Sequence, residues 1–151
     1  IVLVVDEGKE KEAIIRLARV GYDHVAGFLD GGINAWKGET STIHDVSTEE
    51  GVELINNQSK LILDVRKPGE VDLAHVFGSQ HIRLQELSSR LDELDKDVPI
   101  AIYCAGGYRS MIAASLLQKE GFSKITNIQG GFGKLKQFDI QIVEDKSCSN
   151  L

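Results

Sequence analysis

The stretch IAIYCAGGYRSMIAASLLQKE, residues 100–120, joins a short apolar segment, a glycine-rich loop and a helical pattern. Its first four residues are apolar or aromatic, which predicts a buried strand that ends at Cys104. Gly106 and Gly107 follow in the loop, and from Met111 onward apolar residues recur at helical spacing. This order directs backbone N–H groups and a helix N-terminus at one small volume. The stretch therefore predicts that Cys104 is a nucleophile beside an anion-binding loop.

Composition and charge limit the classes of function. The chain has 151 residues, of which 42% are hydrophobic, and this is enough for one domain or a domain and a half with a real core. A net charge of −6 argues against nucleic acid or an anionic membrane as the main partner. The apolar runs are far shorter than the ~20 residues that span a bilayer, and the first residues lack the pattern of a signal peptide. We therefore expect a cytoplasmic protein without a nucleic acid or membrane partner.

The cysteines and histidines do not predict a metal site or a disulfide framework. Cys104 and Cys148 are too few for such a framework, and they suit a reducing compartment, although a bridge between them stays open. His75 and His81 are not spaced with cysteines or carboxylates as metal ligands usually are. We expect no metal and no cofactor, and we expect both histidines to connect loops.

Strand-like and helix-like segments alternate along the chain. Apolar segments predict strands at 1–5, 25–29, 61–65, 98–103 and 124–128. Helical patterns occupy 8–20, 33–37, 47–57, 70–75, 86–94 and 111–120, and Ser47 with Glu50 forms a capping box. The alternation predicts an α/β domain with a mainly parallel sheet covered by helices on both faces.

An internal repeat sets the expected domain organisation. Residues 13–33 parallel residues 113–132, because both copies place a Gly-aromatic pair before a strand and a Gly-Gly turn after it. Residues 1–40 are therefore interpreted as the second half of a domain, residues 41–140 as a complete domain, and residues 141–151 as a polar tail. A half-domain exposes strand edges, so we expect the second domain, another copy of the chain or a missing segment to cover it.

Three side chains outside the loop, Asp64, Arg66 and Glu70, are expected to support the cysteine. Reactive groups of a parallel sheet collect beyond the carboxyl ends of its strands, and Asp64 and Arg66 lie at such an end. Arg66 is interpreted mainly as one half of a structural pair with Glu70. For Arg109 two roles stay open, namely holding the loop or contacting a substrate anion. The amides of the loop are expected to surround the sulfur of Cys104.

Several motifs together resemble the rhodanese family of sulfurtransferases. They are LILDVRKPGEVDLAHVFGSQHI at 61–82, CAGGYRS at 104–110, GF at 121–122 and NIQGG at 127–131. The resemblance implies a three-layer α/β fold with a central, mainly parallel sheet. It also implies that Cys104 takes a sulfur atom from thiosulfate or a persulfide, holds it as a persulfide and passes it to a thiol or cyanide. The loop residues that would cradle this sulfur are Ala105, Gly106, Gly107, Tyr108, Arg109 and Ser110.

The first repeat resembles the carboxyl-terminal half of the same family through GGINAW at 31–36. Its segment VVDEGKE at 4–10 carries Asp6 and no thiol, so we interpret this copy as a degenerate, inactive repeat. Tandem rhodanese-like units also occur fused behind a metallo-β-lactamase-fold persulfide dioxygenase. The resemblance therefore includes the expectation that this chain is a fragment of such a fusion.

Two other functions stay open. Cysteine phosphatases also combine a cysteine and an arginine in one loop, but only four residues separate Cys104 from Arg109, one fewer than in those enzymes. The shorter loop favours sulfur over phosphate. A non-catalytic module that senses sulfur or binds a partner is the alternative outside enzymes. Sulfur transfer ranks first because the complete loop retains its cysteine.

Overall fold

The computed structural model describes residues 1–144. The chain divides into two compact units, Ile1–Ser41 and a second unit that begins at Thr42. This division lies next to the boundary that the repeat places between residues 40 and 41. No helix among residues 1–144 is long and apolar enough to cross a bilayer.

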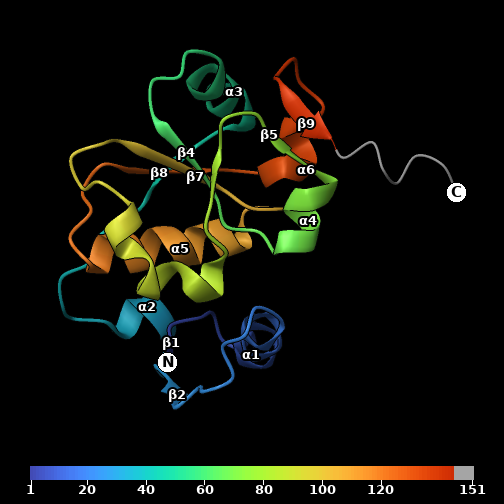
Figure 1. Ribbon diagram of the computed structural model, residues 1–151. Coiled ribbons are helices and arrows are strands. Elements are labelled where there is room, and N and C mark those ends of the chain that lie inside the picture. Colours follow the sequence, from blue (N-terminus) through green and yellow to red (C-terminus); the bar gives the residue numbers. More distant parts are fainter. Residues whose placement is uncertain (145–151) are drawn as a thin grey trace, which may run out of the picture. The chain divides into compact units, whose positions relative to one another are not determined.

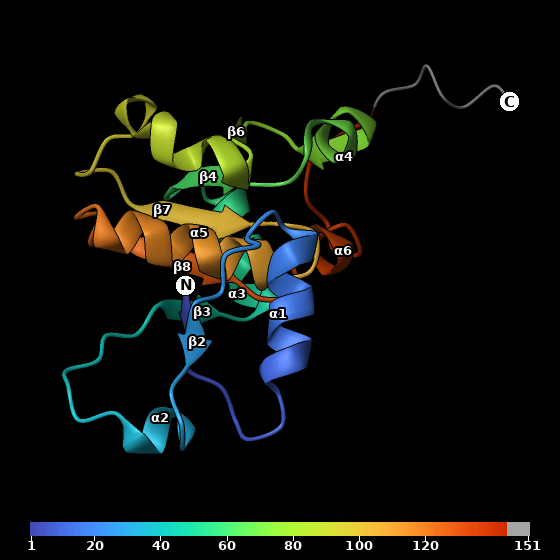
Figure 2. The ribbon, with the colours of Figure 1, turned by 90° about the horizontal axis from the view of Figure 1, so that it is seen from below.

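The second unit is built on a five-stranded sheet in which every pair of neighbours is parallel. In spatial order its strands are β3 (His44–Val46), β8 (Ile125–Ile128), β7 (Ile100–Tyr103), β4 (Leu61–Asp64) and β6 (Gln80–His81). Figures 1 and 2 show α3 and α5 on opposite faces of this sheet. The result is a three-layer α/β fold with a parallel central sheet, as predicted.

The α-helices of this unit match the predicted helices at 47–57 and 111–120 and are shifted at 70–75. They are α3 (Thr48–Asn56), α4 (Pro68–Leu73), α5 (Tyr108–Lys119) and α6 (Gly131–Leu135). The predicted capping box at the start of α3 is confirmed: the Ser47 Oγ accepts from the Glu50 N–H at 3.2 Å, and the Ser47 N–H donates to the Glu50 carboxylate at 2.8 Å. All four residues of the central strand β7 are buried, because both faces of a parallel sheet are covered.

Several predicted elements differ from the structure. Three strands were not predicted: β3 lies between the predicted half-domain and the helix that begins near Ser47, β5 (Ala74–Val76) overlaps the end of the predicted helix 70–75, and β9 (Ile142–Glu144) lies in the predicted tail 141–151. Each of these three strands has three residues and pairs with one neighbour only, whereas alternation is recognised over about four to eight residues. The strand β6 lies within 78–84, which was interpreted as a loop with room for one short strand. The predicted helix 86–94 is a pair of 3₁₀ helices, η1 (Leu84–Ser89) and η2 (Leu91–Glu93).

The predicted helix 70–75 is also shifted. It begins at Pro68, whose fixed φ suits the first helical turn, and it ends at Leu73. The chain then continues as β5 (Ala74–Val76), which pairs antiparallel with β9 and places Val76 opposite Ile142. Cys148 and the rest of the presumed tail lie outside the described residues.

The first unit is a small strand–helix arrangement. Its elements are β1 (Val2–Leu3), α1 (Glu10–Arg19), β2 (Gly27–Phe28) and α2 (Gly32–Ala35), and its two strands pair in parallel. The elements occur in the predicted order, although each strand is shorter than predicted. Leu3 is buried, whereas α1 contains no buried residue and large apolar side chains such as Phe28 and Trp36 are about half exposed.

Candidate active site

The loop after β7 encloses the sulfur of Cys104. Cys104 is 1% exposed, and its Sγ lies 3.1 Å from the N–H of Gly107, which donates to it. The Ser110 Oγ lies 3.5 Å from the same sulfur and 3.0 Å from the carbonyl oxygen of Gly107, to which it donates. Gly107 has φ +100°, a conformation that favours glycine and that turns its N–H into the loop. The loop therefore presents donors to negative charge on the sulfur.

The start of α6 supports the same loop from behind. The carbonyl oxygen of Cys104 accepts from the N–H of Phe132 at 2.6 Å, and that of Ala105 accepts from the N–H of Gly133 at 3.0 Å. A Cβ on Gly131 would lie 2.2 Å from the carbonyl oxygen of Cys104, so no other residue fits there. Gly130-Gly131 was predicted as a turn and belongs to the NIQGG motif of the family resemblance, but its contact with the cysteine loop was not predicted. The Gly130-Gly131 pair is nevertheless the sequence signal for this close approach of two backbones.

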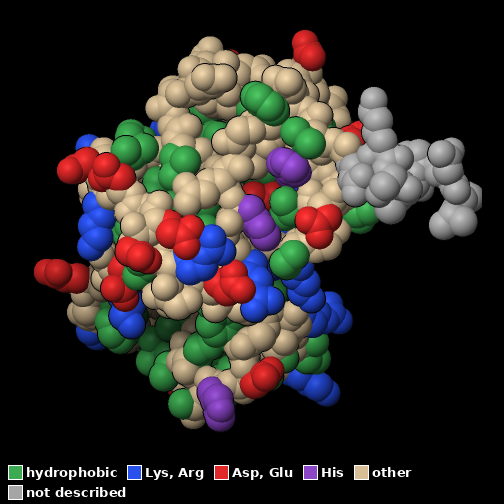
Figure 3. Space-filling model, viewed as in Figure 1, with side chains coloured by type: hydrophobic (Ala, Val, Ile, Leu, Met, Phe, Trp, Pro, Cys, Tyr) green, Lys and Arg blue, Asp and Glu red, His purple; other side chains and the backbone are tan. Residues whose placement is uncertain are grey.

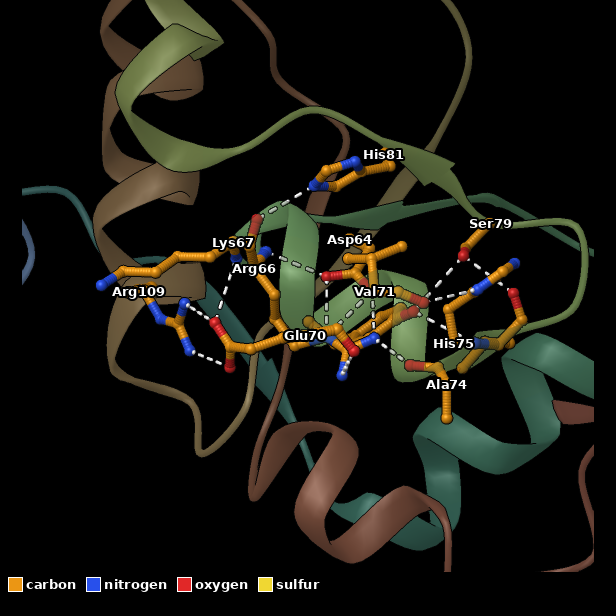
Figure 4. A network of polar contacts seen from close by, with 12 residues as sticks. Asp64, Arg66, Lys67, Glu70, Val71, Ala74, His75, Ser79, His81 and Arg109 are labelled. Carbon is orange, nitrogen blue, oxygen red and sulfur yellow. Dashed lines mark hydrogen bonds and ion pairs between the residues drawn. The ribbon is translucent and has the colours of Figure 1, made fainter. Parts of the chain in front are cut away.

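Arg109 connects the loop to α4. Its Nη1 and Nη2 lie 2.6 and 2.8 Å from the two carboxylate oxygens of Glu70, and Figure 4 shows the Glu70 carboxylate turned towards this guanidinium. Hydrogen bonds from Arg109 and from the backbone N–H of Lys67 hold the pKa of Glu70 below its usual value. Of the two roles left open for Arg109, the structure shows the contact that holds the loop, and this contact is made to Glu70.

Asp64 and Arg66 form a buried ion pair at the end of β4. The Arg66 Nη2 lies 2.6 Å from the Asp64 Oδ2, and the side chains are 3% and 0% exposed. Arg66 also donates to the carbonyl oxygen of Ala74 at 2.8 Å, and its guanidinium lies 4.1 Å from the ring centroid of Phe132. The predicted pairing of Arg66 with the Glu70 carboxylate is wrong. Arg66 reaches only the backbone carbonyl oxygen of Glu70, because Asp64 on the same strand end is nearer.

The two histidines join neighbouring backbone segments. A ring nitrogen of His81 lies 3.0 Å from the carbonyl oxygen of Arg66, and one of His75 lies 3.0 Å from that of Val71. Both histidines were expected to connect two loops; instead His75 in β5 contacts α4, and His81 in β6 contacts the segment that follows β4. Within residues 1–144, no group of three or more histidine, cysteine or carboxylate side chains is arranged to hold a metal ion.

The predicted site residues form two groups, those that contact the sulfur or lie beside the loop and those that are farther from it. Gly107 and Ser110 contact the sulfur, and the Arg109–Glu70 pair lies beside the loop. The Asp64–Arg66 pair is buried behind α4 and reaches the sulfur through no direct contact. The loop residue Tyr108 is 41% exposed.

Known proteins resemble the second unit in sequence. A sequence model described as "Rhodanese-like domain" matches residues 47–137. The chain is 39% identical over 87 residues to the uncharacterized protein YqhL of Bacillus subtilis, covering 58% of this chain and 68% of that protein. It is 38% identical over 92 residues to the putative sulfur carrier protein YrkF of B. subtilis, covering 60% of this chain and half of that protein. The thiosulfate sulfurtransferase GlpE of Pseudomonas fluorescens is 32% identical over 83 residues, covering 55% of this chain and 76% of GlpE.

Solved structures agree with this match. A rhodanese-related protein from Thermoplasma volcanium superimposes with a TM-score of 0.61 at 26% identity, covering 68% of this chain and 99% of that protein. A reduced Bacillus anthracis CoADR-RHD superimposes with a TM-score of 0.55 at 36% identity, covering 60% of this chain and 16% of that one. The parallel sheet, the cysteine loop and both comparisons lead to one assignment: the chain belongs to the rhodanese-like domain family.

Proposed function

We propose that the second unit is a sulfurtransferase in which Cys104 carries the sulfur. The Cys104 thiolate attacks the outer sulfur of thiosulfate or of a persulfide, the S–S bond breaks, and sulfite or a thiolate leaves with the electron pair. A thiolate or cyanide then attacks the terminal sulfur of the Cys104 persulfide, and the Cys104 thiolate is regenerated. Asp64, Arg66 and Glu70 hold the surrounding backbone and do not react.

The observation that carries this proposal is the environment of the sulfur. The Gly107 N–H at 3.1 Å and the Ser110 hydroxyl at 3.5 Å can donate to an anionic sulfur without any movement of the loop. The names of the relatives support the same chemistry, because GlpE is a thiosulfate sulfurtransferase and YrkF a putative sulfur carrier protein.

Two features favour sulfur over phosphate. The four residues between Cys104 and Arg109 form a short loop. Both terminal nitrogens of Arg109 donate to the Glu70 carboxylate, so the charge of Arg109 is already paired and less available to a phosphate. The nearby carboxylate of Asp64 is held by Arg66 and cannot act as a general acid while that pair is intact. A phosphatase is therefore the weaker interpretation.

A non-catalytic sensing or interaction module is the second candidate, and one observation favours it. Cys104 is only 1% exposed, so a substrate must reach a sulfur that the loop almost encloses. A module that is modified once by a small sulfur species needs less access than an enzyme that turns over. Turnover measurements separate these two functions.

The experiment is a thiosulfate:cyanide assay of the wild type and Cys104→Ser, with aryl phosphate hydrolysis measured in parallel. We expect repeated release of thiocyanate by the wild type and none by Cys104→Ser. A single turnover that then stops indicates the sensing module. Hydrolysis of the aryl phosphate without thiocyanate release contradicts the sulfurtransferase proposal.

The proposal extends to the rest of the chain. We propose that residues 1–40 are a partial, inactive rhodanese-like repeat, that residues 41–140 form the active domain, and that another copy or a further segment of chain completes the first repeat. We also propose a cytoplasmic location and a fusion context with a metallo-β-lactamase-fold domain. Size measurements of the purified chain in solution test whether it forms a homo-oligomer, in which another copy completes the first repeat.

A further inference from the structure

The stabilisation of an anionic sulfur on Cys104 depends on groups close to it. On the face that Figure 3 displays, Lys and Arg side chains are interspersed with Asp and Glu side chains, and the chain carries a net charge of −6. That face therefore offers no broad positive field to an anionic sulfur donor. The Gly107 N–H at 3.1 Å and the Ser110 hydroxyl at 3.5 Å supply local donors. Because such donors stabilise charge best from fixed positions, whatever fixes the backbone of the loop affects sulfur transfer.

The first turn of α6 fixes two carbonyl groups of this loop. The Phe132 N–H donates to the carbonyl oxygen of Cys104 at 2.6 Å, and the Gly133 N–H donates to that of Ala105 at 3.0 Å. The first N–H groups of a helix have no partner inside the helix, so they are free to make these bonds. Both carbonyl oxygens are thereby directed at α6. A carbonyl oxygen turned towards the sulfur would instead repel its negative charge.

The guanidinium of Arg66 contacts two aromatic rings beside Cys104. Its Cζ lies 4.1 Å from the ring centroid of Phe132 and 5.5 Å from that of Tyr103. Both distances are within the ~6 Å over which a cation is attracted to the face of a ring. Tyr103 precedes Cys104 in the chain, and Phe132 bonds to its carbonyl oxygen. The cation therefore contacts both residues to which the backbone of Cys104 is attached.

Arg66 is itself held in one place. Its side chain is 3% exposed, its Nη2 lies 2.6 Å from the Asp64 Oδ2, and the same nitrogen donates to the carbonyl oxygen of Ala74 at 2.8 Å. A desolvated cation is attracted to a ring more strongly than an exposed one. The buried Asp64–Arg66 pair thus gives the ring of Phe132 a preferred position, although it does not contact the sulfur.

The turn before α6 does not itself require an aromatic ring. The parallel between residues 13–33 and 113–132 places Ile33 where the second unit has Phe132. In the first unit, Gly32 and Ile33 begin the short helix α2 with an aliphatic side chain that is 57% exposed. Phe132 is 9% exposed, and its ring lies against Arg66. The ring at this position is therefore explained by its contact with Arg66 and not by the backbone turn.

We propose that Phe132 is a positioning residue for sulfur transfer. The Arg66 cation holds its ring, and its N–H in turn keeps the carbonyl oxygen of Cys104 directed away from the sulfur. This inference rests on the proposed function, since it names a residue that orients the nucleophile of that reaction. Phe132 acts through the backbone of Cys104 and takes no part in the bond changes.

The test compares two leucine variants, each of which removes a buried ring from under a cation. Phe132→Leu loses the contact with Arg66 but keeps an apolar side chain and the backbone N–H. Phe122→Leu is the matched control, because Phe122 is 2% exposed and the Lys96 Nζ lies 5.4 Å from its ring centroid. Phe122 follows the end of α5 that is remote from the cysteine loop, and its N–H donates to the carbonyl oxygen of Leu117.

The quantity measured is the rate constant for formation of the Cys104 persulfide from thiosulfate in a single turnover, under conditions where unfolding curves show each variant to be folded. We expect Phe132→Leu to be about tenfold slower than the wild type. A displacement of about 1 Å can cost about 100-fold in rate, and the loss of one contact allows a smaller displacement. The rate for Phe122→Leu should lie within about twofold of the wild type, although its stability also falls.

A tyrosine variant separates the role of the ring from general packing. Phe132→Tyr keeps a ring for Arg66, and residue 132 borders a cavity that has room for the added hydroxyl. We expect this variant to regain most of the rate that Phe132→Leu loses. If Phe132→Leu does not fold, Phe132→Met replaces it, because the flexible methionine side chain fills irregular space without a ring.

Three results overturn the inference. If the wild type is loaded with sulfur and Phe132→Leu is loaded equally fast, the ring does not position the loop, although the sulfurtransferase proposal stands. If Phe122→Leu is slowed as much as Phe132→Leu, or if Phe132→Tyr regains no rate, lost packing explains the effect. If thiosulfate loads no sulfur onto wild-type Cys104, the proposed function fails and the inference fails with it.

Discussion

Two glycine–carbonyl junctions, one in each unit, show the same backbone device with different consequences. In the second unit a Cβ on Gly131 would lie 2.2 Å from the carbonyl oxygen of Cys104. In the first unit a Cβ on Gly32 would lie 2.7 Å from the carbonyl oxygen of Val5. Both glycines have positive φ, +55° and +57°, and both open a short helix after a strand. The parallel supports our proposal that the first unit is a repeat.

The surroundings of the two junctions differ. The helix after the cysteine loop buries Ser110, Ala113, Ala114 and Leu117, whereas α1 buries no residue. Val5 stands at the junction of the first unit and offers no thiol, while the neighbouring Asp6 is exposed. The backbone turn alone therefore supplies no reactive side chain. Of the two junctions, the one at Cys104 has a thiol, a packed helix and an ion pair to α4 beside the loop, and the one at Val5 has none of these.

We expect the largest difference between the two units in the stability lost when an aspartate is replaced, Asp64 in the second unit or Asp6 in the first. Asp64→Ala leaves Arg66 buried at 3% exposure without its partner, so we expect the free energy of unfolding to fall by about 3–5 kcal/mol. Asp6→Ala changes an exposed side chain, and we expect a change within about 0.5 kcal/mol. Urea unfolding followed by circular dichroism measures both. Equal losses for the two variants contradict the structural role of the Asp64–Arg66 pair.

The two glycines provide the next test. Gly131→Ala forces a Cβ into the carbonyl oxygen of Cys104 at a positive φ, so we expect a loss of about 1–3 kcal/mol in stability and a lower yield of Cys104 persulfide. Gly32→Ala introduces comparable strain only in the first unit, so the yield of persulfide should match the wild type. Persulfide yield after incubation with thiosulfate is measured for both variants. An unchanged yield in Gly131→Ala indicates that the junction does not shape the loop.

The smallest effect concerns the pH dependence of stability. The Arg109 hydrogen bonds lower the folded-state pKa of Glu70, so the pair contributes stability that is present above the unfolded value of about 4.3 and is lost as pH falls through the lowered pKa. Because the Glu70 side chain is 35% exposed, solvent screening limits this contribution to about 1 kcal/mol or less.

Glu70→Gln isolates that contribution. The variant should be less stable than the wild type at pH 7, and the difference between the two should shrink as pH falls below about 4.3. Unfolding curves of both proteins at several pH values measure this. A difference that stays constant down to pH 3 would show that the Arg109–Glu70 pair contributes no charge-dependent stability.

The sequence was sufficient for the features that depend on periodicity and capping. The buried strand at 100–103, the helix that follows the loop and the capping box of α3 were all predicted from local pattern. The strands β3, β5 and β9 were missed, because alternation is recognised over about four to eight residues and each of these strands has only three.

The partners of the site residues were harder to predict. Arg66 has two carboxylates nearby in sequence, Asp64 and Glu70, and spacing alone does not decide between them. Arg66 pairs with Asp64 because the end of β4 brings these two side chains together. The Glu70 carboxylate pairs instead with Arg109, which lies 39 residues away in the sequence.

Mass spectrometry of the peptide that contains residue 104 tests whether Cys104 carries the transferred sulfur as a persulfide. Wild type and Cys104→Ser are incubated with thiosulfate, freed of small molecules and digested, and the peptide that contains residue 104 is weighed. We expect an addition of about 32 Da, one sulfur atom, on this peptide in the wild type, its removal by cyanide, and no addition in Cys104→Ser. A wild-type peptide that gains no sulfur from thiosulfate or from any other sulfane donor contradicts the account.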